Sequence, residues 1–532
     1  MNQRPQLQKA IGKFGFFSLA FGSMIGVGWL TGVKGWLENA GPGGAILAFA
    51  LGGALMLAIG FCYAKVMEML PVSGGEVAYA YKAFGTGESF LIGWFLTFGY
   101  LSVSAFEAVS IGIVLSYLMP FDYWPLYVIQ DETVYLSHLL LAAGLTALIA
   151  FVNFRGVGMA TILQSILTLL LVTCTASFVI AGITNGSFAN LEPMFGSAEG
   201  QTGLKGVLAV FITVPFWFVG FDTIPQAAEE RTDSVSANKL GRVLLWSIIG
   251  ATCFYAAVIL SVAMVTPLAS IQGEDLPTAA AFEKAFESPA LARMVLLVAL
   301  VGLLTSWNGF FLSGTRVLFA MGRGHVIHPA FGRPHARFGT PALAILFAAL
   351  ITVAGAFLGK PAVLVLVNVG SACIALAFLG VTLSLSVILR RSGKSISALT
   401  WVLIGTAMIG SLLILLAMLI PQSPVAFSMS SYEWPILAAL SALGGVVWVL
   451  SRRQRGSITE AERTRLILDE QSSGDSAAVT QRRRLDNEAS MSASLCFPRF
   501  NKPSTAPCVT AKRPAIESWD RFSRNRIFNA SR

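Results

Sequence analysis

Charged residues are scarce in this chain of 532 residues: they make up 12%, whereas hydrophobic residues make up 55%. Apolar runs of about 20 residues, the length that crosses the hydrocarbon core of a bilayer as a helix, recur from one end of the sequence to the other. This composition excludes an ordinary soluble domain and is typical of a polytopic membrane protein. We therefore expect the chain to be embedded in a lipid bilayer.

Cysteine is also rare, with six residues in all. Four fall in apolar runs and two lie near the C-terminus, so none is placed to form an extracellular disulfide. The sequence has no glycine-rich P-loop of the Walker type, which excludes ATP as the direct source of energy. No small-residue cleavage site follows the first apolar run, so we expect no cleavable signal peptide.

The apolar runs predict an all-α polytopic fold with twelve transmembrane helices. Each run is long enough to span the bilayer. The approximate bounds are 14–36, 43–67, 89–119, 134–154, 157–183, 204–228, 242–267, 290–321, 340–359, 361–389, 398–420 and 433–451.

The net charge of +9 does not indicate a nucleic-acid partner, because the basic residues are sorted by loop and are enriched in the C-terminal tail. Lys9 and Lys13 precede the first run and Arg323 follows the eighth, whereas Asp122 and Glu274 lie in loops of the opposite parity. By the positive-inside rule, both termini are cytoplasmic in a multi-pass protein of the plasma membrane.

The chain divides into three parts by composition. Residues 1–13 form a cytoplasmic N-terminus, 14–452 the transmembrane domain, and 453–532 a cytoplasmic tail that we expect to be mostly disordered. One short helix is expected within the tail, at 459–468. A basic tail beside a membrane either binds anionic lipid or is simply solvated, and composition leaves both alternatives open.

The stretch FGSMIGVGW, residues 21–29, places three glycines in the middle of the first apolar run. One interpretation is close helix packing, because Gly22 and Gly26 form a small-xxx-small pair. The other is that the helix is broken here, which frees backbone N–H and C=O groups at mid-membrane depth. Such groups are tolerated only where they line a cavity or bind a ligand.

A second interruption favours the broken helix. The sixth run contains VPFWFVGFDTIPQAAEE, with Pro215, Gly220 and Pro225 inside one apolar segment. Interrupted first and sixth helices are what an inverted repeat of five plus five helices predicts, as in the leucine-transporter fold, with the binding site between the two breaks. The repeats would span about 14–184 and 204–390, followed by two further helices at 398–451.

Five motifs along residues 10–452, in the same order as in the family, resemble those of the amino acid-polyamine-organocation (APC) permeases. GSMIGVGW is similar to the glycine motif of their first helix, and FVGFDTIPQAAEE to the motif of their sixth. The other three are LPVSGGEVAYAYKAFG at 70–85, NFRGVG at 153–158 and SGTRVLFAMGRGHVIHPAFGRPHARFGTP at 313–341. The resemblance implies a secondary active transporter of amino acids that works by alternating access.

The resemblance also implies a substrate site made largely of backbone. The substrate carboxylate would be held by N–H groups where the first helix reopens, at Gly26, Val27 and Gly28, a position that favours an anion. Its ammonium group would be held by carbonyls near Ser23, Met24 and Ile25 and near Phe218, Val219 and Gly220. Neighbouring side chains would then set selectivity: Phe216 as an aromatic gate, Trp217 and Phe221 on the sixth helix, Thr97, Leu101 and Ser104 on the third, and Trp307 and Asn308 on the eighth.

Among the charged side chains within the apolar runs we single out Asp222, Glu107 and Arg316, because such groups are costly in mid-span and face a cavity or a partner. Asp222 either caps the second half of the sixth helix or senses substrate or protons. Glu107 either titrates during transport, meets a cationic substrate, or is an internal hydrogen-bonded carboxyl. Arg316 is expected to snorkel or to pair with an acid of an internal gate, Glu229 or Glu230.

The coupling ion is left open between Na⁺ and H⁺. Several proton-coupled APC permeases carry a lysine in the fifth helix, but the matching register gives Leu171 here, and no lysine lies between Arg155 and Lys205. The hydroxyls of Thr305 and Ser306, together with carbonyls near Gly22 and Ile25, offer oxygen ligands for Na⁺. Ordinary hydrogen bonding between helices explains the same residues equally simply.

The sequence thus predicts an amino acid transporter without an organic cofactor and without catalytic activity, acting as a cation-coupled symporter. The alternatives are an amine, polyamine or ethanolamine permease, an amino acid exchanger, and, in a different class, a membrane channel or receptor. A membrane enzyme would need a clustered nucleophile, acid–base or metal set, and apart from Asp222 and Glu107 the apolar runs offer none.

Overall fold

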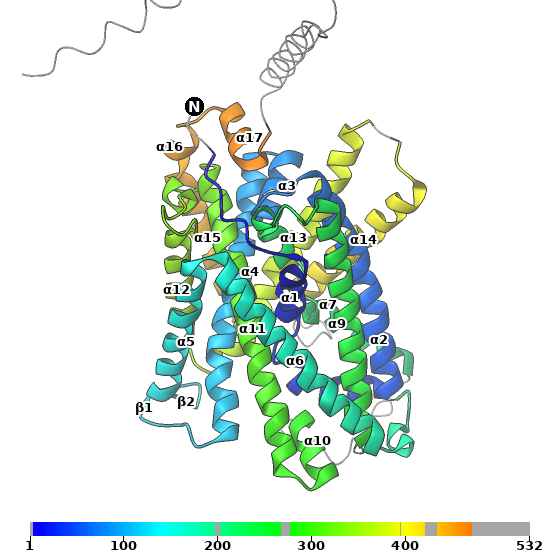
Figure 1. The fold of residues 1–532 in the computed structure, drawn as a ribbon. Helices are drawn as coiled ribbons and strands as arrows, with labels where there is room; N and C mark the ends of the chain where they lie inside the picture. Colours follow the sequence, from blue (N-terminus) through cyan, green and yellow to red (C-terminus); the bar gives the residue numbers. More distant parts are fainter. Residues whose placement is uncertain are drawn as a thin grey trace, which may run out of the picture. The chain divides into compact units, whose positions relative to one another are not determined.

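The computed structural model describes residues 4–196, 203–265, 267, 277–393, 395–420 and 433–470. Of the tail at 453–532 that is expected to be mostly disordered, residues 471–532 lie outside the described residues. Within them the chain forms long helices that run side by side, with one small hairpin (Figure 1). The elements are α1 (Lys13–Met24), α2 (Gly28–Met69), α3 (Gly75–Ala83), α4 (Thr86–Leu118), β1 (Pro125–Ile129), β2 (Glu132–Tyr135), α5 (Leu136–Arg155), α6 (Val157–Asn185), η1 (Phe188–Leu191), α7 (Gly203–Trp217), α8 (Thr223–Gln226), η2 (Ala228–Glu230), α9 (Ala237–Val265), α10 (Pro277–Phe286), α11 (Pro289–Arg323), η4 (Pro329–Gly332), α12 (Ala342–Ala356), α13 (Ala362–Arg391), α14 (Ala398–Leu419), α15 (Glu433–Leu450), α16 (Arg452–Arg455) and α17 (Glu460–Leu468).

The helices have the length and composition of a multi-pass membrane protein. Nine helices in the described part of the chain are long and apolar enough to cross a bilayer, and α7 and α12 are shorter apolar helices. Each of the twelve apolar runs overlaps a helix, and the first run covers α1 and the start of α2. The helical, polytopic architecture is therefore confirmed, while the count of twelve spans remains a prediction.

The first apolar run is broken in the middle of its glycine-rich stretch. α1 ends at Met24 and α2 begins at Gly28, so 25–27 are not helical. Backbone groups at such helix ends have no partner within the helix and become available to other groups. α2 also bends further along, where Gly41 adopts a φ of +70° directly before Pro42.

The sixth apolar run is broken as well. α7 ends at Trp217, a series of turns follows, and the short helix α8 begins at Thr223. Gly220 lies in these turns with a φ of +128°, and a β-carbon there would lie 2.7 Å from the backbone nitrogen of Met24. The two breaks are therefore in direct contact, and a residue with a side chain does not fit at Gly220.

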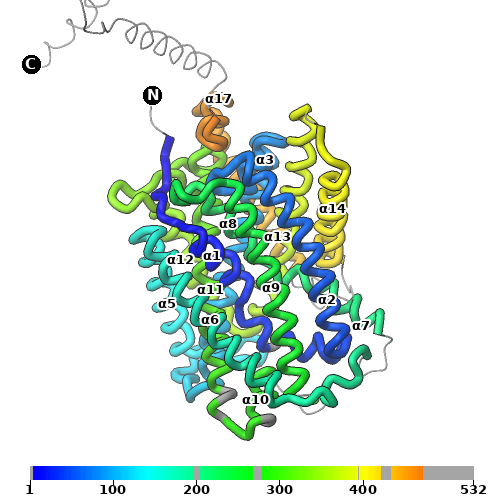
Figure 2. The backbone as a smooth tube through the Cα atoms, turned by 45° about the vertical axis from the view of Figure 1, so that its right-hand side comes forward, coloured from blue at the N-terminus to red at the C-terminus, as the bar shows by residue number. Residues whose placement is uncertain are grey.

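The helices that carry the two breaks pack against each other and against longer helices. α2 packs against α7 and α9, whereas α4 packs against α11, α12 and α13. α1 contacts α6, α9 and α11 (Figure 2). This packing buries both breaks in the interior.

A β-hairpin between α4 and α5 departs from the all-α expectation. β1 and β2 pair in the antiparallel sense, with Ile129 opposite Glu132. Gln130 and Asp131 form the turn, and both adopt a positive φ. The strands are rich in aromatic and β-branched residues, which favour extended backbone.

The chain continues beyond the last apolar helix into two short helices. α17 begins after Thr459, whose hydroxyl accepts a hydrogen bond from the backbone N–H of Glu462 at 3.2 Å. This confirms the short helix expected at 459–468. Ile467 and Leu468 are buried, so this part of the expected tail is packed against the rest of the protein.

Candidate functional site

A cavity of about 220 Å³ lies between the two breaks. Its walls come from both interrupted helices and from α4, α9, α11 and α13. Most of the lining is apolar, and the carboxyl group of Glu107 is its one acidic group among the described residues. The lining residues are Ser23, Met24, Gly26, Val27, Gly28, Val103, Phe106, Glu107, Phe216, Trp217, Val219, Tyr255, Ser306, Phe310, Val363, Leu364, Val367, Ser371 and Ile374.

Close contacts between the breaks explain why glycine is needed at the start of α2. A β-carbon on Gly28 would lie 2.1 Å from the ring of Trp217, so any side chain there would collide with the end of α7. A β-carbon on Gly26 would lie 3.1 Å from Oε1 of Glu107 and 3.4 Å from Oγ of Ser306. Both interpretations of these glycines therefore apply, because the glycines allow the helix break and also allow close packing around it.

Glu107 is buried on α4 and faces the cavity. Its carboxyl group hydrogen-bonds to the hydroxyl of Ser306. Oε2 has no hydrogen-bond partner among the described residues. A buried carboxyl oxygen without a partner is costly, so this group is suited to bind a proton or a cationic ligand.

Tyr255, which the sequence analysis did not single out, joins the two breaks. Its hydroxyl lies 3.1 Å from the carbonyl oxygen of Met24 and 2.9 Å from that of Trp217, the last residues of α1 and α7. The ring is buried and packs against the rings of Phe49 and Phe218, with centroids 4.8 and 5.8 Å away. Nothing in the local sequence around 255 marks this role, because both partners are backbone atoms distant in the chain.

Asp222 lies outside the cavity lining and within a buried network. Its Oδ2 accepts a hydrogen bond from the hydroxyl of Tyr100 at 2.7 Å, and its Oδ1 accepts one from the N–H of Gly220 at 2.9 Å. Its side chain makes no capping hydrogen bond to α8. Gln226 extends the network to Glu76 on α3, to which its amide group donates. Burial, followed by the nearby charge of Asp222, raises the pKa of Glu76 above its usual value.

The three α4 residues expected to set selectivity do not line the cavity. The hydroxyls of Thr97 and Ser104 donate to carbonyls of their own helix, at 2.7 and 3.2 Å, and Leu101 is buried beside Gly314. The cavity wall on this helix is formed instead by Val103, Phe106 and Glu107. The face of α4 that meets the cavity is therefore displaced around the helix from the expected one.

On the sixth apolar run, Phe216, Trp217 and Val219 line the cavity. Phe221 points elsewhere: its ring stacks on that of Phe378, with centroids 5.3 Å apart. Phe218 is buried and packs against Tyr255.

Asn308 and Trp307 on α11 are buried but lie outside the lining. Asn308 belongs to a chain of amides: its Nδ2 donates to Oε1 of Gln164 at 2.7 Å, and Nδ2 of Asn153 donates to its Oδ1 at 2.9 Å. Ser306 and Phe310 are the α11 residues that reach the cavity.

The four residues expected to hold Na⁺ are divided between two places. Ser306 faces the cavity, while Thr305 donates to the carbonyl of Gly302 at 2.7 Å. Gly22 faces the amide of Gln164, whose nitrogen would lie 2.5 Å from a β-carbon there. That nitrogen donates to the carbonyls of Ser18 and Thr305, at 3.1 and 3.0 Å. Ile25, the fourth of these residues, is buried, and its carbonyl faces Gly302. Leu171, at the register where several APC permeases carry a lysine, is buried on α6.

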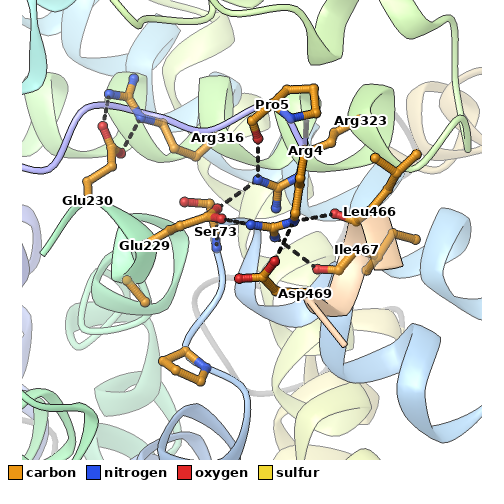
Figure 3. Close-up of polar contacts among 12 residues, drawn as sticks. Arg4, Pro5, Ser73, Glu229, Glu230, Arg316, Arg323, Leu466, Ile467 and Asp469 are labelled. Atoms are coloured by element: carbon orange, nitrogen blue, oxygen red, sulfur yellow. Dashed lines mark hydrogen bonds and ion pairs between the residues drawn. The ribbon is translucent and has the colours of Figure 1, made fainter. Parts of the chain in front are cut away.

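A charge cluster made of Arg4, Glu229, Glu230, Arg316 and Arg323 lies at the end of the helices where α17 packs (Figure 3). Arg316 binds Glu230 through Nε and Nη2 at 2.8 and 2.9 Å, which confirms the pairing expected from the sequence. Glu229 is held between Arg4 and Arg323. Burial by itself raises the pKa of Glu229, but the charges of Arg323 and Arg4 outweigh burial and bring this pKa below its usual value.

Arg4 also connects this cluster to the C-terminal helix. Its Nε donates to the carbonyl of Leu466 at 3.0 Å, and Asp469 lies 3.5 Å from the same nitrogen (Figure 3). The N-terminal segment and the end of α17 therefore meet over Glu229.

Comparisons with known proteins agree with this architecture. A family model described as amino acid permease matches residues 11–449. The chain is 26% identical to the branched-chain amino acid permease BcaP of Lactococcus lactis subsp. cremoris over 402 residues, covering 73% of this chain and 83% of the relative. It is 27% identical to the methylthioribose transporter of Bacillus subtilis over 347 residues, 64% and 73% of the two chains. It is 26% identical to cationic amino acid transporter 7, chloroplastic, of Arabidopsis thaliana over 377 residues, 69% and 63% of the two chains.

Proposed function

Because the chain belongs to the amino acid permease family, we propose that it is a secondary transporter that binds amino acids in the cavity between its two helix breaks. The observation that carries this proposal is that one cavity is lined by residues of both breaks, Gly26 and Val27 on one side and Phe216 and Val219 on the other. The members of the family are permeases and not enzymes, so the polar groups of this site serve binding.

The backbone around the cavity suits a zwitterion. Gly26 and Val27 lie just before the N-terminus of α2, where N–H groups and the helix dipole favour a carboxylate. Met24 and Trp217 end α1 and α7, where carbonyl groups favour an ammonium group. The carboxylate and the ammonium group of an amino acid can thus each contact a helix end of complementary partial charge.

The apolar lining suits a substrate with an apolar side chain. Val103, Phe106, Phe310 and Ile374 contribute hydrophobic surface to the cavity. One relative is named as a permease of branched-chain amino acids, whose side chains are apolar. We therefore propose neutral, apolar amino acids as the first class to test.

Glu107 is our candidate for ion coupling, with a proton as the coupling ion. Its Oε1 approaches Gly26, beside the N–H groups proposed to hold the substrate carboxylate. Two carboxylates this close repel each other unless one takes up a proton. Binding of an amino acid would thus favour protonation of Glu107, and the two would be carried together.

The same contact supports a second candidate, a transporter of amines. If Glu107 remains ionised, it attracts a cation to the cavity and disfavours a second carboxylate. A substrate with an amino group and no carboxylate would then bind best. The cationic amino acid transporter among the relatives is consistent with a positively charged substrate.

We further propose twelve spans with an inverted repeat of five plus five helices, and cytoplasmic termini in the plasma membrane. The positions of the breaks in the first and sixth apolar runs support the repeat, and the sorting of basic residues among the loops supports the orientation. On this view the charge cluster lies at the cytoplasmic end.

The test of the function is uptake into proteoliposomes with and without an inward proton gradient, for the wild type and for Glu107→Gln. We expect the gradient to drive accumulation of a neutral amino acid by the wild type. Glu107→Gln should exchange substrate across the membrane but lose accumulation driven by the gradient. Full gradient-driven accumulation by Glu107→Gln would reject the coupling role, and preferential uptake of amines lacking a carboxylate would favour the second candidate.

A further inference from the structure

The short helix α17, which follows the last apolar helix, is docked on both α3 and α11. The hydroxyl of Thr464 lies 2.9 Å from that of Tyr81 on α3. Nε of Arg463 donates to the carbonyl of Gly324, directly after α11, at 3.2 Å. A single short helix therefore connects two elements that are far apart in the sequence.

The contact between α17 and α11 has an apolar centre. Ile467 and Leu468 are only 2% and 5% exposed. A β-carbon on Gly324 would lie 2.5 Å from Cγ1 of Ile467, so the end of α11 accepts this side chain because residue 324 has none. Arg463 adds a positive charge at the C-terminal end of α11, where the helix dipole favours a cation. The helix is thus held by fitted packing as well as by polar contacts.

α17 also holds Arg4 of the N-terminal segment in place. Arg4 donates to the carbonyls of Leu466 and Ile467, at 3.0 and 3.5 Å, and Asp469 lies 3.5 Å from its Nε (Figure 3). The same guanidinium group binds Glu229, in the segment that follows α8. Through Arg4, α17 is therefore also linked to the continuation of the second broken helix.

The elements joined by α17 are those that must part if the cavity opens at this end. Glu229 is 2.8 Å from Nη1 of Arg323 on α11, and it accepts a hydrogen bond from the N–H of Ser73, just before α3, at 3.2 Å. The cavity itself lies between the sixth apolar run and α11, since Val219 and Ser306 both line it. A path from the cavity to this end therefore runs between the segment after α8 and α11. A helix docked across these elements resists their separation.

We propose that α17 is an autoinhibitory latch: docked as in this structure, it holds this end of the transporter closed, and it undocks before the cavity opens there. This inference rests on the proposed transport function. Substrate passes this end only in states in which α17 has moved, so the docking equilibrium limits the rate of transport. The latch affects the rate and not the selectivity, because neither α17 nor Arg4 lines the cavity.

The first test is Ile467→Asp, which places a charge in the apolar contact with Gly324 and so favours undocking. Its matched control is Ala461→Asp, which introduces the same residue at an exposed position of the same helix. The initial rate of amino acid uptake per amount of purified protein should rise several-fold in Ile467→Asp and stay at the wild-type value in Ala461→Asp. A rate in folded Ile467→Asp that equals or falls below that of the wild type would overturn the latch.

A reversible cross-link provides a second test in which α17 stays docked. A β-carbon at position 324 would lie 2.5 Å from Cγ1 of Ile467, an atom one bond away from the β-carbon of that residue. Gly324→Cys/Ile467→Cys therefore brings two β-carbons to the separation of about 3.5–4.5 Å that a disulfide needs. Oxidation should reduce uptake in proportion to the cross-linked fraction, and dithiothreitol should restore it. The control is Ile467→Cys alone, which keeps the natural cysteines but has no partner at 324, and its uptake should not respond to oxidation.

The outcomes separate the latch from the transport function. Equal uptake by the oxidised and the reduced double variant would contradict the latch, because transport would then not require α17 to leave α11. That result would leave the transport function intact, since both forms take up substrate. Absence of uptake of every amino acid and amine by both the wild type and Ile467→Asp would instead reject the transport function itself.

Discussion

The guanidinium group of Arg316 donates two parallel hydrogen bonds to the carboxylate of Glu230, with Nε 2.8 Å from Oε1 and Nη2 2.9 Å from Oε2. Both side chains are almost completely buried, at 0% and 1% exposure. Because the bidentate geometry satisfies both charges, the pair joins the segment after α8 to α11 firmly. A transporter that opens at this end has to separate or carry along this pair.

Replacing only one of these two residues should destabilise the protein strongly. Arg316→Met leaves Glu230 buried without its partner, a change that costs about 3–5 kcal/mol in comparable sites. The measurement is thermal unfolding of the purified protein in detergent. Arg316→Met combined with Glu230→Leu should recover much of the lost stability, since neither charge is then left alone. A double variant less stable than the single one would contradict this account.

A bulky residue at the first break should abolish substrate binding while the protein still folds. In Gly26→Leu the side chain would meet Glu107 and Ser306 at the cavity wall. Gly35→Leu is the control, because no atom lies within 4 Å of a β-carbon at that position on α2. Binding of labelled amino acid to purified protein should be lost in the first variant and kept in the second. Normal binding by Gly26→Leu would mean that the glycines serve packing alone.

Transport should not require sodium. The space beside Gly22 and Thr305 is taken by the amide of Gln164, which already donates to the carbonyls of Ser18 and Thr305. Replacing external Na⁺ by choline at constant pH should therefore leave the initial rate of uptake unchanged. The opposite result is a strong loss of uptake by the wild type in choline, with no such loss in Thr305→Ala/Ser306→Ala. That result would assign a sodium site to these two hydroxyls.

Lowering the pH should weaken the charge cluster, because it protonates Glu229. Its pKa in the folded protein lies below the usual value, so the ionised form stabilises the fold at pH values above the pKa of an unfolded glutamate. This contribution is lost as the pH falls through the folded pKa. Glu229→Gln should lower the melting temperature at pH 7, and the difference from the wild type should shrink at low pH.

The control for Glu229→Gln is Asp233→Asn, which removes an exposed carboxylate that pairs with Lys9 at the surface. Exposed pairs contribute little to stability, so its melting temperature should follow that of the wild type at every pH. A difference between Glu229→Gln and the wild type that persists unchanged at low pH would show that Glu229 stabilises the fold by packing and not by charge.

The features that could be predicted from the sequence are those that require particular residue types. Glycine and proline inside apolar runs located both breaks, and acids near the end of the sixth run located the partner of Arg316. Each of these signals is local, since a few poor helix formers or one buried charge reveal it.

Features that depend on the rotation of a helix or on distant backbone atoms could not be predicted. On α4 the small polar residues are scattered among apolar ones and show no single polar face, so the hydrophobic pattern does not distinguish the face with Val103 and Phe106 from the face with Thr97 and Leu101. Tyr255 is one of three aromatic residues in α9, and its role arises only once two carbonyls from other helices lie beside it. Tertiary packing alone supplies that information.

The measurement that tests the central claim most directly is counterflow in proteoliposomes. Vesicles are preloaded with an unlabelled neutral amino acid, and a trace of the labelled compound is added outside. The account predicts transient accumulation of label by the wild type and none by Gly26→Leu, whose cavity is filled. Absence of counterflow with every amino acid and amine of a broad panel, or equal counterflow by Gly26→Leu, would contradict transport through the cavity between the two breaks.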